Sequence, residues 1–145
     1  MRKNHTILKN EVEGICVSLE TDGARRFYAA LDAAGSISRS GSGKMTDKHD
    51  DLFIGITKDH LFEKLIPIIS ETLFQGIGQS FNIPFQDDIP CSLTISFQIK
   101  EKIENIIIKY GYNSGLPDDV RAFLRAILDL TEPWYQLQKQ KKHGE

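Results

Sequence analysis

Hydrophobic and polar residues alternate regularly over residues 91–99, as they do in a strand with one buried and one exposed face. After a short turn at 100–102, a second apolar run at 103–110 completes a predicted hairpin. Apolar residues then recur at helical spacing over 117–130, behind a proline that suits a helix start. The sequence Thr-Glu-Pro at 131–133 is expected to end this helix and begin a short second one.

The first part of the chain shows the same alternation in two shorter runs, 15–20 and 27–31, which predict two strands. Asp22-Gly23 between them is a strong hairpin signal, because both positions of a two-residue turn need positive φ. A further turn leads to residues 36–40, which read as a short polar edge strand. Arg39 is expected to guard that edge with its charge.

The middle of the chain combines one strand, one helix and one long connection. The apolar run 52–56 predicts a buried strand. Leucines and isoleucines spaced by four over 57–73 predict an amphipathic helix, with Thr57 as its N-cap. Pro67 should kink or divide this helix. The segment 75–90 is longer than an ordinary connection. Its alternating apolar residues suggest that it is draped over the core.

Strands and helices in the order β-β-(β)-β-α-β-β-α predict an α+β fold. We expect an antiparallel sheet of about five strands with two main helices packed on one face. The domain should span residues 11–138, between a flexible segment at 1–10 and a basic flexible tail at 139–145. A chain of 145 residues can bury enough surface to fold as one domain without a disulfide or metal.

Composition argues against several classes of protein. The formal net charge is −2, whereas a dedicated nucleic-acid binder usually shows a basic excess. Neither a signal peptide nor an apolar run of membrane-spanning length is apparent, which favours a cytoplasmic protein that binds no membrane. Cys16 and Cys91 fall in predicted strands and are expected to be free thiols.

Candidate chemistry is weak throughout the sequence. Residues 41–44 resemble a phosphate-binding loop, but Ser38 and Met45 stand where that motif needs Gly and Ser or Thr. The acidic loop at 47–51 lacks the central Gly and terminal Glu of a calcium-binding loop. No Ser or Cys stands in a recognisable arrangement with a histidine base. The sequence therefore favours a non-enzymatic protein, with no cofactor and no metal site expected.

Three segments carry a resemblance to a known group: Gly35-Ser-Ile-Ser-Arg-Ser-Gly41 after a strand, Phe62 in the first helix, and Leu116-Pro-Asp-Asp-Val120 opening the last. Across residues 15–130 the chain resembles small bacterial domains of the emfourin-like, protease-inhibitor type. In size, charge and lack of catalytic groups it is also similar to single-domain α+β immunity proteins that neutralise bacterial toxins. The resemblance implies an inhibitor that binds a protein.

The leading hypothesis is thus a protein-binding module, such as an immunity-type inhibitor of a toxin or secreted enzyme with a basic active site. The partner-binding residues we expect are acidic and lie in loops: Asp47, Asp50, Asp51, Asp87 and Asp88. One alternative is a small enzyme or ligand-binding domain with a pocket between sheet and helices, near His49 or His60. Another is a homodimeric structural domain that pairs through an open sheet edge; the sequence permits a monomer or a homodimer.

Overall fold

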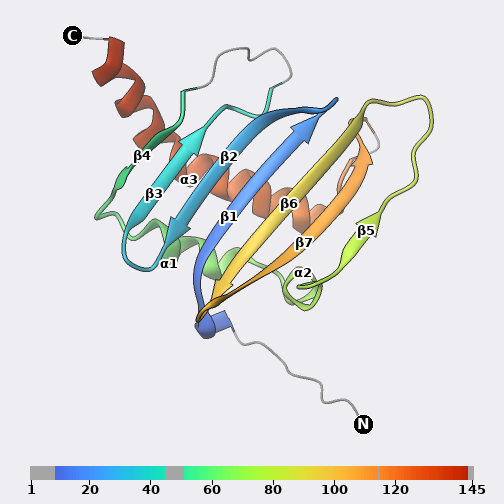
Figure 1. Cartoon of the computed structure of the whole chain (residues 1–145), viewed down its shortest axis with the longest axis horizontal. Helices are drawn as coiled ribbons and strands as arrows, with labels where there is room; N and C mark the ends of the chain where they lie inside the picture. The colour runs from blue at the N-terminus through green and yellow to red at the C-terminus, as the bar shows by residue number, and fades with distance from the viewer. Residues whose placement is uncertain (1–8, 45–50, 114, 144–145) are drawn as a thin grey trace.

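The computed structural model describes residues 9–44, 51–113 and 115–143 of the chain. The strands are β1 (Val12–Thr21), β2 (Ala24–Asp32), β3 (Ser36–Ser40), β4 (Phe53–Ile56), β5 (Ser80–Asn82), β6 (Pro90–Ile99) and β7 (Lys102–Gly111). The helices are α1 (Leu61–Leu65), α2 (Glu71–Gln75) and α3 (Asp118–His143), with single 3-10 turns η1 (Lys9–Glu11) and η2 (Ile66–Ile68). The strands form one seven-stranded sheet in the order β4-β3-β2-β1-β6-β7-β5. Helices α1, α2 and α3 lie against one face of it (Figure 1).

The α+β class and the mainly antiparallel sheet are confirmed, but the sheet is larger than the five strands predicted. Strand β5 was not predicted: it lies within the connection 75–90 and pairs in parallel with β7, so the sheet is mixed. The alternating apolar residues of 75–90 were interpreted as a draped segment, but Ser80–Asn82 within it pairs as a strand. Strand β4 is not buried as predicted, because it forms the opposite edge of the sheet and only Phe53 and Gly55 face the helices.

The helices match the prediction at one point and differ from it at three. The predicted helix over 57–73 is divided at Pro67, as expected, into α1, η2 and α2. Its N-cap is His60, in a left-handed conformation, and not Thr57. Helix α3 does not end at 131–133: it continues through Pro133 to His143. Most of the basic segment 139–145, expected to be a flexible tail, is therefore helical.

The core is a single apolar layer between the sheet and the helices. Alternate residues of β1, β2, β6 and β7 point into it, and Phe123 and Ile127 of α3 are completely buried there. The ring of Phe74 on α2 meets that of Phe97 on β6 edge to face at 5.9 Å. The β1–β2 hairpin has the predicted two-residue turn, with positive φ at Asp22 and Gly23. The β6–β7 turn, predicted over 100–102, is shorter: Ile99 pairs with Lys102, and Lys100 has positive φ.

Arg39 does not guard an edge, because β4 pairs beyond it and strand alternation turns its side chain inward beside Ile37. Its guanidinium is fully buried. It donates to the Gly41 carbonyl oxygen (Nε, 2.9 Å), to Thr131 Oγ1 (Nη1, 3.0 Å) and to Glu132 Oε1 (Nη2, 2.8 Å).

Two aromatic rings complete the surroundings of Arg39. Its Cζ lies 4.3 Å from the ring centroid of Tyr135 and 5.0 Å from that of Phe27. The Tyr135 hydroxyl in turn accepts a hydrogen bond from the Gly41 amide at 2.9 Å. Contacts from residues on both sides of the proline explain why α3 continues past it: the packing of Thr131 and Tyr135 on Arg39 outweighs one lost helical hydrogen bond.

Replacing Arg39 with Ala should lower the free energy of unfolding by about 3–5 kcal/mol, because buried polar partners lose their donor and a cavity forms. Arg25→Ala on the neighbouring strand is the matched control. Its guanidinium is exposed over Tyr28, so its loss should cost less than about 1 kcal/mol. Urea unfolding of both variants measures the difference, and equal costs would contradict the role given to Arg39.

The contact between Arg39 and Glu132 should also make the free energy of unfolding depend on pH. Burial by itself would raise the pKa of Glu132. Hydrogen bonds from Gln136 and Arg39, with the charges of Arg39 and Lys139, outweigh it and hold that pKa below its usual value.

A carboxyl with a lowered pKa in the fold stabilises the protein above its unfolded pKa of about 4.3 and loses this effect as the pH falls. Wild type should therefore be more stable than Glu132→Gln near pH 7 (about neutral), with the gap closing toward about pH 3. Urea unfolding at a series of pH values tests this expectation. A gap independent of pH would show that the carboxylate charge contributes nothing.

Candidate functional site

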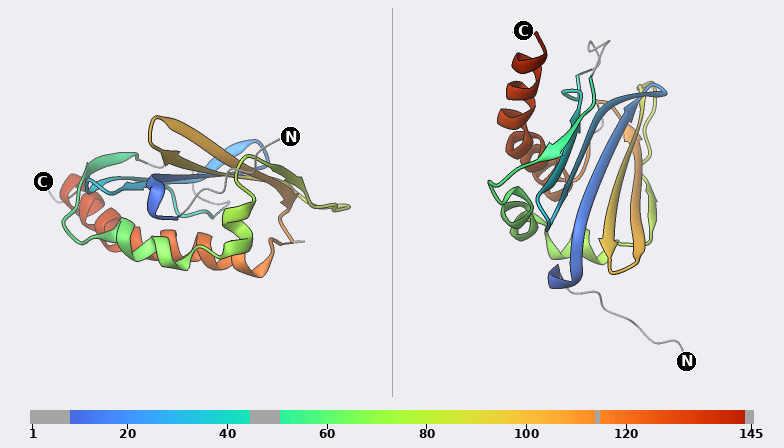
Figure 2. Two further views of the ribbon diagram at one scale, coloured as in Figure 1. Left: turned by 90° about the horizontal axis from the view of Figure 1, so that it is seen from below. Right: turned by 60° about the vertical axis from the view of Figure 1, so that its left-hand side comes forward.

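The face of the sheet opposite the helices is covered by no described element (Figure 2). We call it the open face. The strand registers align its side chains in rows that cross the sheet. One row holds Ile54, Ser38, Ala30, Cys16, Ser96 and Asn105; the next holds Ser40, Tyr28, Ser18, Thr94 and Ile107. The described side chains of these two central rows carry no formal charge, and most of them are small.

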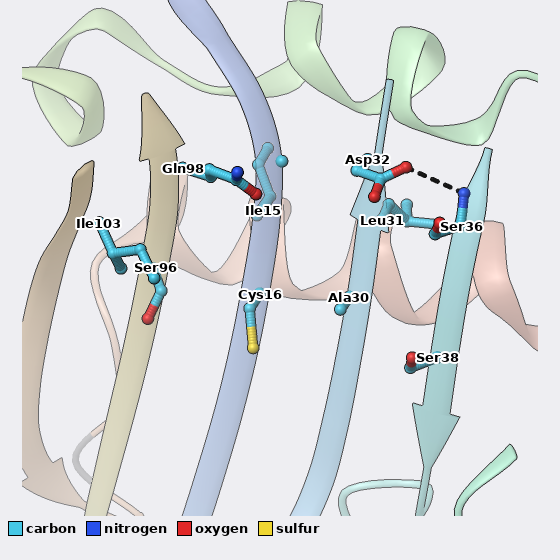
Figure 3. A pocket seen from close by; sticks show the side chains of 11 residues that line it. Ile15, Cys16, Ala30, Leu31, Asp32, Ser36, Ser38, Ser96, Gln98 and Ile103 are labelled. Atoms are coloured by element: carbon cyan, nitrogen blue, oxygen red, sulfur yellow. Dashed lines mark hydrogen bonds between the residues drawn. The ribbon is translucent and has the colours of Figure 1, made fainter. Parts of the chain in front are cut away.

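A shallow hollow of about 160 Å³ crosses the open face, and we call it the trough (Figure 3). Its centre is lined by Gly14, Cys16, Ala30, Ser38 and Ser96, which come from four neighbouring strands. The hollow exists because none of these side chains is large enough to fill the space above the sheet. A partner's side chain or backbone can therefore approach the sheet closely here.

A side chain larger than that of Gly14 would fit tightly in the trough. A Cβ atom placed on it would lie 3.3 Å from both Asp32 Cβ and Gln98 Oε1. Asp32 itself has a structural role, because its Oδ1 accepts hydrogen bonds from the amides of Ala34 (3.0 Å) and Ser36 (2.9 Å) and so closes the β2–β3 turn. Its carboxylate also lines the trough.

Exposed apolar side chains lie on both sides of the trough, on the edge strand β4 and on β7. Ile54 and Ile56 on β4 are 74% and 76% exposed, and Ile103 on β7 is 69% exposed. Edge strands usually carry charged residues or proline at such positions, which discourage pairing with other chains. Isolated exposed apolar residues need no explanation, but three that lie beside one hollow with an uncharged centre suggest a contact surface.

Cys16, the thiol in the trough, has a raised pKa. Burial is the main cause, and it outweighs the opposing effects of a hydrogen bond with Tyr28 and the charge of Arg25. The hydrogen bond with Cys16, together with burial, raises the pKa of the Tyr28 hydroxyl to about 12. Both groups are therefore neutral near pH 7, and neither has the low pKa of an activated nucleophile.

The acidic residues predicted to bind a partner are not brought together. Asp51 Oδ1 lies 2.9 Å from Lys142 Nζ of α3, whereas Asp87 and Asp88 belong to the β5–β6 connection. Four strand spacings of about 4.8 Å separate β4 from β6, so these loops are roughly 19 Å apart. Asp47 and Asp50 lie outside the described residues.

Asp88 has a structural role that the sequence did not indicate. Its carboxylate accepts hydrogen bonds from the amides of Asn113 (2.9 Å) and Ile89 (2.8 Å), which join the segment before β6 to the segment after β7. A Cβ on Gly111 would lie 2.5 Å from Asp88 Oδ2, so the carboxylate packs directly against the end of β7. Asp87 is exposed. A role of these acids in binding stays a prediction.

The described part of the chain gives little support for the alternative site around a histidine. His60 is exposed and approaches only Glu63, at 4.0 Å, while His49 lies outside the described residues. Among the residues that are described, no three His, Cys, Asp or Glu side chains come close enough to hold a metal ion. None of the described helices is long and apolar enough to cross a membrane.

No protein-family model matches this chain, and no curated protein is significantly similar to it. The rows of the open face were not predicted from sequence, because they depend on the registers between strands. The polar faces of individual strands were the only available signal, and the structure confirms that those of β6 point outward.

Cys16 should react slowly with iodoacetamide, because its raised pKa leaves little thiolate at about pH 8. Tyr28→Phe removes a hydrogen bond that lowers the pKa of Cys16, so this variant should react more slowly still. Labelling is measured by peptide mass against free glutathione, with Cys16→Ala reporting any reaction at buried Cys91. Faster labelling than glutathione would indicate an activated thiol and contradict a binding role without chemistry.

Proposed function

We propose that this protein is a non-enzymatic protein-binding module that holds its partner on the open face. The partner class is a toxin or secreted enzyme that the module inhibits, as an immunity-type inhibitor does. The observation that carries the proposal is the trough: an uncovered hollow whose two central rows carry no charged side chain, with exposed isoleucines beside it. This combination matches the anatomy of protein interfaces, whose centres are depleted of charge.

A merely solvated face is the competing explanation, since antiparallel sheets often expose one polar face to water. The distribution of charged residues on the open face argues against that explanation. Charged residues of the open face lie toward its ends, with Glu20, Arg25 and Lys109 at one end and Asp32 at the other. Between them, small hydroxyl side chains offer hydrogen bonds at little entropic cost when they become buried.

Strand β4 extends this surface to the edge of the sheet. The Thr57 amide donates to the Gly35 carbonyl oxygen at 2.8 Å, so the antiparallel alternation directs the backbone groups of Ile54 and Ile56 away from β3. An extended segment of the partner can pair with these groups while it covers both isoleucine side chains. A second copy of this chain would use the same edge, and light scattering at rising concentration distinguishes the two.

In this proposal, the acidic loops contribute to binding through longer-range electrostatic attraction of the partner. Asp51, Asp87 and Asp88 flank the same end of the sheet, because Asp51 lies shortly before β4, Asp87 and Asp88 lie shortly before β6, and both strands begin at that end. Acidic groups in these positions favour a partner with a basic surface by speeding its approach, and the effect weakens as salt is added.

The test introduces charge and bulk into the trough. Ser38→Arg combined with Ser96→Arg should abolish partner capture, because two long cations fill the hollow and meet no described acid at its centre. Gln75→Arg with Gln140→Arg adds the same charge to exposed helix positions and serves as the control. Proteins retained from a lysate of the source organism by each immobilised variant are compared by mass spectrometry, and each retained protein is then assayed for inhibition.

The expected result is a protein retained by wild type and by the control but not by the trough variant, and inhibited on binding. Both double variants should unfold within about 1 kcal/mol of wild type, because all four positions are at least partly exposed. Equal retention by the two double variants would contradict the site.

A further inference from the structure

A second cavity lies on the opposite side of the sheet from the trough. It is a cleft of about 860 Å³ between the first half of α3 and the segment that follows β3. Its floor includes Leu19, Phe27 and Leu128, and its rim carries Lys44, Arg121 and Arg125. The volume falls within the range of roughly 300–1,000 Å³ typical of small-molecule sites. We call it the basic cleft.

Core residues of β1 and β2 form part of the floor of the basic cleft. Leu19 and Phe27 lie opposite each other on β1 and β2, with their side chains on the helix side of the sheet. The Gly43 amide donates to the Arg26 carbonyl oxygen at 2.9 Å and anchors the segment beside the floor. Gly43 has a φ of +87°, and a Cβ there would lie 4.0 Å from both Leu19 Cδ2 and Phe27 Cβ.

The rim of the cleft has an excess of positive charge. Its lining includes three cations but one carboxylate, that of Asp118, although the whole chain has a net charge of −2. Arg121 and Arg125 are one helical turn apart, so both guanidiniums project from the same side of α3. Two like charges at this spacing disfavour a helix, and an anion bound between them would relieve the repulsion.

The carboxylates that pair with the two arginines do not prevent the guanidiniums from binding a ligand. Arg121 pairs with Asp118, and Arg125 Nη1 lies 4.0 Å from Asp129 Oδ1. All four side chains are mostly exposed, and exposed pairs of this kind contribute little to stability. A carboxylate that enters the cleft can accept paired hydrogen bonds from a guanidinium, which adds geometric specificity to the attraction between the charges.

We infer that the basic cleft binds a small amphipathic carboxylate, with its anionic head on Arg121 and Arg125 and its apolar chain or ring on the half-buried Leu124 and Leu128. Lys44 faces the head from the other wall. An apolar floor alone would accept any hydrophobic molecule, and a basic rim alone would accept any anion. The combination selects a ligand that has both parts. This site is independent of the open face, so either proposal can fail without the other.

Dodecanoate, kept below its micelle concentration, is the probe, and isothermal titration calorimetry measures its binding to the full chain. We expect one saturable site. Acetate lacks the apolar chain and dodecyltrimethylammonium reverses the charge of the head, so each should bind about tenfold more weakly or not at all. Equal binding of dodecanoate and dodecyltrimethylammonium would overturn the inference, because it would show that the basic rim selects nothing.

Two variants locate the site. Arg121→Gln with Arg125→Gln should weaken dodecanoate binding about tenfold, whereas the matched control Lys58→Gln with Lys64→Gln, which removes two exposed charges near α1, should leave it unchanged. Ala122→Trp fills the cleft from an exposed helix position and should abolish binding with the basic rim intact. Unchanged affinity in both cleft variants, or no saturable binding by wild type, would overturn the inference.

Discussion

The buried guanidinium of Arg39 is the interaction on which the arrangement of this molecule depends. It joins β3 to α3 through Thr131 and Glu132 and fixes the start of the next segment through Gly41. A charge at this depth is tolerated only because every side of it is occupied by an acceptor or an aromatic ring. Helix α3 is thereby held against the β3–β4 end of the sheet, with its final turns beside the edge strand.

This attachment determines where functional surfaces can exist. With α3, α1 and α2 all on one side, the other face of the seven-stranded sheet has no described cover, and its small side chains leave the trough. On the helix side, the segment that leaves Gly41 passes over the end of the core and forms one wall of the basic cleft. The two proposed sites therefore lie on opposite sides of one sheet.

Much of the fold could be predicted because local patterns decide it. The alternation in β6 and β7, the Asp22-Gly23 turn and the division of a helix at Pro67 each follow from neighbouring residues. Arg39 was misplaced although a signal existed: it shares strand parity with Ile37, which directs both side chains inward. The partners of the buried charge, Thr131 and Glu132, lie on α3 far along the chain, so no local pattern indicates how it is paired.

The candidate sites were less predictable because they depend on non-local geometry. The trough needs the registers of four strands, and the basic cleft needs Lys44 to face a helix that lies more than seventy residues later in the chain. Loop acids attracted the sequence-based prediction, yet Asp88 hydrogen-bonds with Asn113 and Asp51 pairs with Lys142. Polar loop residues often stabilise turns, and composition alone does not distinguish this structural role from a role in binding.

The central claim is that a protein partner occupies the open face, and site-specific photo-crosslinking in the source cells tests it most directly. A photoreactive amino acid placed at Ser96, in the trough, should give one discrete crosslinked protein on irradiation. The same group at Gln140, exposed on α3 away from the trough, should not give that product. A specific adduct from Gln140 and none from Ser96 would contradict the account.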